Sequence, residues 1–463
     1  RSDFSKYPNG LEICLNLIVL AEGGAMRRSA SRYVSELKSS SVVGHIKGFQ
    51  YSTTQAYMLE FGAQAMRFYR FQAKITAVDI TGSIANGTFA SDVASWDDKD
   101  SGGTAASTWN SAGYMQLVGD GTNYAWRQQT VASVTNGLAY TIKFRIIGSP
   151  GDKVVLQVGT SDGGLETVNR EFPVGYHCYT FTAAATTIYV GFRHLAAKAL
   201  GVDDVSFIDG TAVEIDTPYV EADLPTVDGP QSADVLYLFH STYPTYKLER
   251  YAHSSWSLVE VNWLDGPYLD MNTTTTTMDV SATSGLGITI TASAVTGINS
   301  NEGFKTTDVG RLIRIDNPAT GVNWGYARIT GFTSTTVVTA DVKRAFLSTD
   351  ADVRWRLGSW SATTGYPSCG EFFEQRLFAA ANTNQPQTFW ATQTGDIENH
   401  SPDSPTAAGV WDGTVEDDDA LDYTISANKV QAIRWLSPGE DTLVIGTLSG
   451  EWVPSSTGAV LTP

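Results

Sequence analysis

The chain has 463 residues, of which 42% are hydrophobic and 17% charged, and its formal net charge is −18. A chain of this length exceeds a single core, so two to four domains are expected, and its hydrophobic content excludes a disordered tail protein. No apolar run approaches the roughly 20 residues that a membrane-spanning helix needs.

The charge is unevenly distributed along the chain. Residues 1–76 carry +5, residues 77–215 carry −6 and residues 216–463 carry −17. An acidic two-thirds repels nucleic acid, so DNA that meets this protein is expected to pass by without being gripped. Ordinary solubility charge is the alternative explanation. Three widely spaced cysteines, Cys14, Cys178 and Cys369, lack any metal-like spacing and are interpreted as buried free thiols formed in a reducing cytoplasm.

The first 71 residues contain the most informative order of elements. These elements are a polar start (Arg1–Gly10), an apolar segment (Leu15–Leu20), a Gly-Gly hinge (Gly23-Gly24), an arginine pair (Arg27-Arg28) and two β-like runs (Tyr57–Phe61 and Ala65–Tyr69). This order resembles the start of the tail nozzle proteins of short-tailed phages, also called tail tubular protein B or phage stabilisation proteins. In that family further residues precede the Arg1-Ser-Asp-Phe element, so we expect a clipped N-terminus.

The resemblance implies a structural virion protein of the phage tail that assembles in the host bacterial cytoplasm. In the nozzle family, hexameric rings contact a tail adaptor protein and extend the head-to-tail channel. Such a ring retains the packaged DNA and lets it pass on ejection. The resemblance also implies a β-propeller core, of which residues 1–76 would be the first part. Arg27 and Arg28 are subunit-interface candidates against an acidic neighbouring surface; simple solvation is the alternative.

Residues 77–212 read as a self-contained all-β block inserted into the propeller. Strands are predicted at Ala139–Ile147 and Lys153–Val158, where apolar residues alternate. The Asn86-Gly-Thr-Phe start and the Val202-Asp-Asp-Val-Ser-Phe end resemble those of jelly-roll carbohydrate-binding modules. That resemblance implies a structural calcium ion near Asp204, with Asn86 as a partner; the alternative is an aspartate that caps a turn. No other cofactor is expected.

Aromatic residues are concentrated in this block. Sugars present apolar C–H faces that stack on aromatic rings, so Trp96, Trp109, Tyr114 and Tyr124 are glycan-contact candidates. Trp126 stands in an alternating strand and is predicted to fill the core. A purely structural, decorating role for the block is the alternative to host-glycan binding.

The propeller is predicted to continue at residues 213–274 and 355–463, where pairs of short strands carry aromatic residues between turns. The segment between them, residues 275–354, is similar to the small FCCH-like β-barrel of ubiquitin-activating enzymes, a likeness of fold only. The chain stops after a blade-like strand, so a truncated C-terminus is expected. The predicted fold is therefore all-β: a propeller core with a jelly-roll insert and a small barrel insert.

The acidic run Glu416, Asp417, Asp418 and Asp419 is the densest in the chain. Consecutive residues rarely converge on one metal ion, and the run lacks the spacing of a calcium loop. These residues are channel-lining candidates, since an acidic wall would keep DNA from adhering; an ordinary solvated run is the alternative.

No catalytic residues are assigned. The six histidines lack metal-ligand spacing, and the sequence contains no Gly-x-Ser-x-Gly element or phosphate-binding loop. The preferred prediction is a tail nozzle protomer rather than an enzyme. Two alternatives remain: a secreted glycan-binding or glycan-cleaving multidomain protein, and a receptor-binding adhesin of the virion.

Overall fold

The computed structural model describes residues 13–20, 24–316, 322–427, 429–440, 442–454 and 461–463. Within them the fold is all-β, as the sequence predicts, and helical structure is limited to three 3-10 turns. These are η2 (Leu224–Thr226), η3 (Asn299–Asn301) and η4 (Thr306–Asp308). The chain divides into two compact units, residues 1–36 and residues 37–463.

The first unit contains one hairpin, formed by β1 (Leu17–Val19) and β2 (Ala25–Arg27) with Ile18 opposite Met26. Every described residue from 13 to 36 is exposed, apart from the half-buried Cys14 and Ser35. The unit therefore has no core of its own in the part that is described. The predicted Arg1–Gly10 element lies outside the described residues.

The second unit begins with the predicted hairpin of residues 57–69, which the structure extends to a larger sheet. Its strands are β3 (His45–Ser52), β4 (Gln55–Gly62), β5 (Ala65–Arg70), β6 (Ala73–Lys74) and β17 (Glu214–Asp216). Because β17 pairs with β5, chain segments on both sides of the intervening block belong to one sheet. The amide of Ala77 donates to Thr211 O at 2.8 Å, so the block's entry and exit run side by side.

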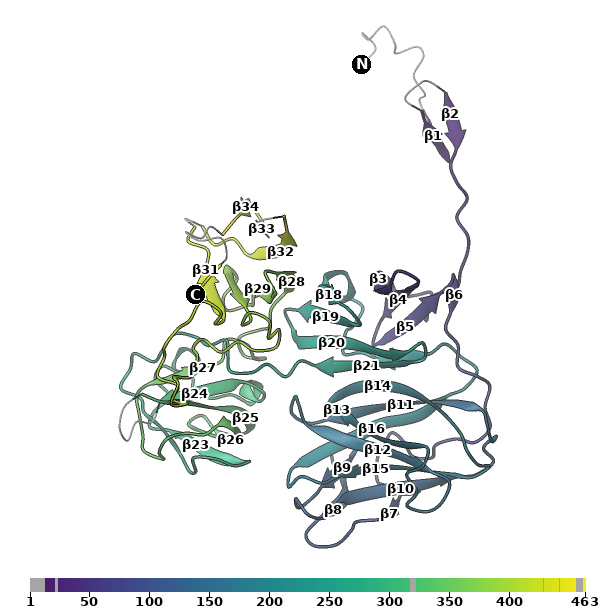
Figure 1. The fold of residues 1–463 in the computed structure, drawn as a ribbon, viewed down its shortest axis with the longest axis horizontal. Helices are drawn as coiled ribbons and strands as arrows, with labels where there is room; N and C mark the ends of the chain where they lie inside the picture. The colour runs from purple at the N-terminus through teal and green to yellow at the C-terminus, as the bar shows by residue number, and fades with distance from the viewer. Residues whose placement is uncertain (1–12, 21–23, 317–321, 428, 441, 455–460) are drawn as a thin grey trace. The chain divides into compact units, whose positions relative to one another are not determined.

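Between these segments lies a two-layer sandwich (Figure 1). One layer is the five-stranded sheet β13-β12-β15-β10-β7, and the other is β14-β11-β16-β9-β8. The strands are β7 (Asp97–Asp98), β8 (Ala106–Asn110), β9 (Tyr114–Val118), β10 (Ala125–Val131), β11 (Ala139–Ile147), β12 (Lys153–Gly159), β13 (Val168–Pro173), β14 (Gly175–Thr182), β15 (Ile188–His194) and β16 (Ala199–Ile208).

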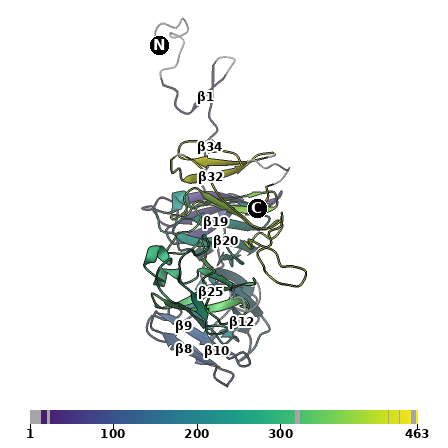
Figure 2. The same ribbon diagram turned by 90° about the vertical axis from the view of Figure 1, so that its left-hand side faces the viewer.

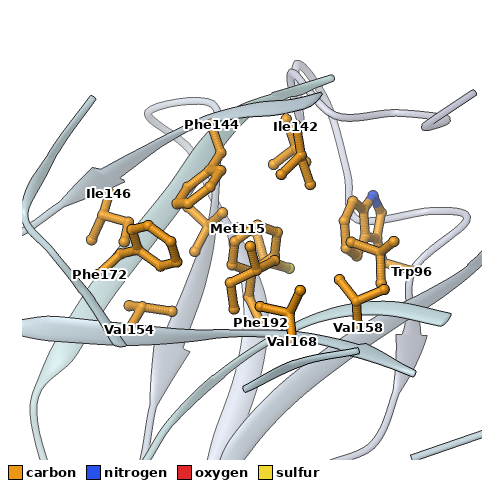
Figure 3. Packing of buried hydrophobic residues seen from close by; sticks show 14 of the residues in the cluster. Trp96, Met115, Ile142, Phe144, Ile146, Val154, Val158, Val168, Phe172 and Phe192 are labelled. Atoms are coloured by element: carbon orange, nitrogen blue, oxygen red, sulfur yellow. The ribbon is translucent and has the colours of Figure 1, made fainter. Parts of the chain in front are cut away.

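The sandwich core follows from period-two alternation on both layers. On β11, Tyr140, Ile142, Phe144 and Ile146 all point inward and are at most 1% exposed, as their alternation predicts. Figure 3 shows Phe144 beside Phe172 of the opposite layer, whose ring centroids lie 5.1 Å apart. Burying such side chains contributes about 1.5–3 kcal/mol each.

The second sandwich layer does not end at its own edge. Strand β14 pairs with β21 (Ser255–Glu260), which joins the layer to β20 (Tyr243–Ala252), β19 (Val235–His240) and β18 (Gln231–Ser232) in one nine-stranded sheet. We call the β14–β21 pairing the seam. At the seam, Ser257 Oγ donates to His177 Nδ1 at 2.8 Å, while His177 Nε2 donates to Pro173 O at 2.7 Å. Burial lowers the pKa of His177 to about 3, so the ring is neutral.

A six-stranded sheet, β22-β23-β26-β25-β24-β27, curls around its own apolar core in residues 278–357. Its strands are β22 (Met278–Val280), β23 (Ile288–Ala292), β24 (Leu312–Asp316), β25 (Trp324–Ser334), β26 (Val337–Arg344) and β27 (Trp355–Leu357). Lys198 of the sandwich reaches Asp341 of this sheet at 2.5 Å and Asp152, in the sandwich loop before β12, at 2.6 Å. This shared ammonium ties the sandwich to the six-stranded sheet.

Of the two remaining sheets of the second unit, the first packs against the nine-stranded sheet and the second packs against the first (Figures 1 and 2). They comprise β28 (Cys369–Phe373), β29 (Arg376–Ala380), β30 (Thr388–Ala391) and β31 (Leu421–Thr424), then β32 (Ile433–Pro438), β33 (Leu443–Thr447) and β34 (Glu451–Trp452). Phe239 of β19 packs with Leu377 of β29 in one core cluster. On the other side of β19–β21, Trp256 stacks on Phe68 of β5 at 4.2 Å.

We predict that Ser257→Ala destabilises the protein by about 1–3 kcal/mol, because His177 Nδ1 then stays buried without a donor. Denaturant unfolding followed by circular dichroism measures the change. Ser161→Ala, in an exposed loop of the sandwich, is the matched control. Equal unfolding midpoints for the two variants would show that the seam hydrogen bond contributes nothing.

Candidate functional site

Strand β10 carries two sets of side chains that face opposite ways. Ala125 and Val131 are in the sandwich core, whereas Trp126 is half-buried outside it, on the outer face of the five-stranded sheet. The prediction that Trp126 fills the core is therefore wrong. Ala125 and Val131 take the inward-facing positions of the strand, so the alternation places the indole of Trp126 on the outer face.

The outer face is organised around Gly191 of β15. Gln128 of β10 and Gln157 of β12 are both register partners of Gly191, and Trp126 pairs with Arg193 in the adjoining row. A Cβ on Gly191 would lie 2.8 Å from Trp126 Nε1. The absence of a side chain at Gly191 thus allows the indole to lie close against the sheet.

A loop and an aromatic–cation pair border this face. Gly163 N donates to Gln128 Oε1 at 3.1 Å, and Gln157 Nε2 donates to Gly163 O and Gly164 O at 3.1 and 3.0 Å. Beside them, the guanidinium of Arg193 stands 4.6 Å from the ring centre of Tyr124. Cation–π contact of this kind holds both side chains in place at the surface.

Several polar atoms of this face are buried without a hydrogen-bond partner. They are Trp126 Nε1, Gln128 Nε2, Gln157 Oε1 and Arg193 Nε. Buried polar groups are nearly always paired, so a cluster of unpaired ones around an aromatic ring needs an explanation. The half-buried Trp126 and Tyr124 place aromatic rings at this face, and the C–H face of a sugar stacks on such rings.

The predicted glycan-contact residues do not gather at one place. Trp96 is 2% exposed and packs among the core rings Phe89 and Phe192, so it offers no face to a sugar and that assignment is wrong. Trp109 is 38% exposed at the sandwich edge, where its Nε1 donates to Phe89 O. Tyr114 lies over Gly201 on the other sheet.

Of that set, Tyr124 alone adjoins the outer face described above. Sequence reasoning missed Gln128, Gln157 and Arg193, which come together through strand register. The available signal was the alternation in Ala125–Val131, which places Trp126, Gln128 and Thr130 on one side.

The segments of the two proposed calcium ligands do lie side by side, since Val205 N donates to Gly87 O at 2.9 Å. The Asn86 amide, however, donates from Nδ2 to Asp92 Oδ1 and Ala94 O, both at 2.9 Å, and so closes its own loop. Asp204 sits in a bulge of β16 with a φ of 53°. Calcium needs six to eight oxygen ligands. Within the described residues, no group of three or more His, Cys, Asp or Glu side chains is placed to hold a metal.

The acidic run forms a turn rather than a strand, and its members differ. Glu416, Asp417 and Asp418 are exposed. Asp419 is fully buried: Oδ1 accepts from Gln393 Nε2 and Ser404 Oγ, each at 2.8 Å, and Oδ2 accepts from Glu416 N at 2.7 Å. Asp419 is therefore a structural residue and cannot line a channel, which corrects that part of the prediction.

Arg27 and Arg28 are both exposed in the first unit. They accompany a series of exposed apolar side chains, and six of these are 45% exposed or more: Ile13, Leu15, Leu17, Ile18, Val19 and Met26. An apolar surface of this kind marks an interaction site in a soluble protein.

A charged opening of about 490 Å³ is lined by residues from four different sheets. Lys47 of β3, His240 of β19, Glu371 of β28 and Arg434 of β32 contribute to its walls. Lys47 forms an ion pair with Asp228 there. Burial raises the pKa of Glu371, while its backbone hydrogen bond and Lys47 act in the opposite direction.

Comparison with known proteins gives no family for this chain. No protein-family model matches it, and no curated protein matches it. In the part of the chain that the structure describes, no helix is long and apolar enough to cross a membrane.

We predict that Asp419→Ala destabilises the protein by about 1–3 kcal/mol, because three donors lose their buried acceptor. Asp418→Ala, one residue earlier and exposed, is the control and should change stability by less than about 0.5 kcal/mol. Thermal unfolding of the two variants provides the measurement. If Asp419→Ala and Asp418→Ala unfold at the same temperature, the hydrogen bonds to Asp419 contribute nothing to stability.

Proposed function

We propose that this chain is the protomer of a phage tail nozzle, in which copies form a ring that extends the DNA channel, retains the genome and lets it pass on ejection. The observation that carries the proposal is the apolar, exposed first unit. A two-stranded hairpin is at best marginally stable alone. The apolar side chains of this hairpin would stabilise it by packing against another chain.

Charge favours a second copy of this chain as that partner. The first 76 residues carry +5, to which residues 1–36 contribute +1 and residues 37–76 contribute +4, and the remainder is strongly acidic. A basic segment that docks on the acidic body of the next copy makes a heterologous contact, and such contacts close into rings. Arg27 and Arg28 then lie at the subunit interface, and the sixfold number follows from the family resemblance.

The stacked sheets support a propeller core. In a propeller the sheets are arranged radially around a central channel. Here the charged opening receives residues from strands of four sheets, β3, β19, β28 and β32, as a propeller channel would. The sandwich of residues 77–212 would be the jelly-roll insert, and residues 275–354 the small barrel insert. Exposed Glu416, Asp417 and Asp418 remain candidates for an acidic wall that DNA passes.

The test of the ring is the assembly state of the purified protein, measured by mass photometry and electron microscopy. We predict that Ile18→Glu combined with Val19→Glu abolishes the ring and leaves a folded monomer, because two charges enter the apolar contact. Leu286→Glu, an equally exposed apolar position in the second unit, is the control and should keep the ring. A wild-type monomer at micromolar concentration, or a ring unaffected by the double variant, would contradict the proposal.

A second candidate function is favoured by the outer face of the five-stranded sheet. Its aromatic rings suit a host-surface polysaccharide, which the virion would contact through the jelly-roll insert. This role is compatible with the nozzle, because it uses a surface that the first unit does not form.

We predict that the full-length protein binds host-cell polysaccharide and that Trp126→Ala weakens binding about tenfold or more, since stacking on one ring contributes roughly 1–3 kcal/mol. Trp109→Ala, at the sandwich edge, is the matched control and should bind like the unmodified chain. Glycan-array binding and calorimetry measure the effect, with circular dichroism to verify folding. If Trp109→Ala alone abolishes binding, the site lies at the sandwich edge and the outer face is excluded.

A further inference from the structure

A cavity of about 210 Å³ lies where the sandwich, the nine-stranded sheet and the six-stranded sheet meet. The sandwich contributes the Gly148–Pro150 loop, the nine-stranded sheet contributes Thr245 and Glu260, and the six-stranded sheet contributes Arg328. Trp263 and Trp360 form an aromatic wall, with ring centroids 5.2 Å apart at an angle of 67°. The cavity therefore depends on three parts of the second unit being held together.

Two opposite charges line this cavity without meeting. Within the described residues, the Glu260 carboxylate accepts no hydrogen bond and forms no ion pair. The charge of Arg328 is nevertheless close enough to lower the pKa of this carboxyl. Burial raises the pKa of Glu260 to about 7, and Arg328 offsets this only in part. The half-buried Glu260 carboxylate and the buried Nε of Arg328 both lack a partner in this cavity, which suggests a ligand that pairs with them.

Further polar groups of the cavity walls also lack partners. Arg328 is 4% exposed; its Nη2 donates to Asn262 Oδ1 and Trp263 O, but its Nε has no acceptor. The hydroxyl of Thr245, at 1% exposure, and the indole nitrogen of Trp360 are unpaired as well. One side of the cavity thus offers an anionic acceptor and the other offers N–H donors on a cation.

We infer that this junction cavity binds a small zwitterion, an amino acid whose ammonium group pairs with Glu260 and whose carboxylate pairs with Arg328. A zwitterion satisfies both charges and leaves the site neutral overall. Its aliphatic body lies against the Trp263 and Trp360 rings. Bound in this way, the ligand bridges the nine-stranded and six-stranded sheets and stabilises their junction with the sandwich.

The test uses the full-length protein at pH 8 and a series of ω-amino acids of increasing length: glycine, β-alanine, 4-aminobutyrate and 5-aminopentanoate. Calorimetry and thermal unfolding should give one best length, set by the spacing of the two charged groups. Butylammonium and butyrate each satisfy only one end and should bind at least about tenfold more weakly. No binding up to about 10 mM, or equal binding of butylammonium, would overturn the inference.

Glu260→Gln separates binding from folding. Because the folded pKa of Glu260 lies above its unfolded value, its carboxyl stabilises the protein at low pH, and this stability is lost as pH rises through about 7. The neutral amide should therefore make the ligand-free variant more stable than the unmodified chain at pH 8, while removing the stabilisation by the best ω-amino acid. Glu171→Gln, on the exposed face of β13, is the control and should retain that stabilisation. A Glu260→Gln variant that still responds fully would exclude Glu260 from the site.

Discussion

The seam between β14 and β21 is the contact on which the arrangement of the second unit depends. A sandwich inserted into a loop could be joined to its host by two covalent crossings alone, with one layer ending in an open strand. Here the edge of that layer continues as backbone hydrogen bonds into the host sheet, with Gly175 opposite Val259 and Cys178 opposite Trp256. The buried pair of His177 and Ser257 adds a side-chain hydrogen bond at the same place. An edge strand that would otherwise invite unwanted pairing is covered, and the orientation of the sandwich is fixed.

This orientation determines what the neighbouring parts can form together. With the sandwich held against the nine-stranded sheet, Lys198 reaches Asp341 on the six-stranded sheet, and Asn262 lies between Gly151 and Arg328. The junction cavity occupies the space that these contacts enclose. The unpaired carboxylate of Glu260 and the unpaired Nε of Arg328 come to the same cavity because the nine-stranded and six-stranded sheets meet there.

The two units contrast in how they obtain stability. The second unit buries aromatic residues in several clusters, such as Trp256 with Phe68, whereas described residues of the first unit expose most of their apolar side chains. Apolar area contributes only when it is removed from water, at about 25 cal/mol per Å². A segment with this composition is therefore suited to an assembled state, in which a neighbour supplies the missing surface. The proposed ring and the proposed glycan face would thus use separate parts of the molecule.

The sequence by itself determined the fold class and many strands, because period-two alternation and turn residues are local properties. Tyr140, Ile142, Phe144 and Ile146 are predicted to alternate in a strand, and all are buried.

Predictions from the local pattern were wrong where burial depended on residues that are distant in the sequence. Trp126 is predicted to fill the core because it stands in an alternating strand, yet Ala125 takes the inward phase. Trp96 is predicted to contact glycan, yet Phe89 and Phe192 enclose it. Asp419 reads as one more carboxylate in an acidic run, and only the folded turn brings Gln393 and Ser404 to it. The seam, the row through Gly191 and the cavity between Glu260 and Arg328 join residues far apart in sequence, so tertiary pairing alone decided them.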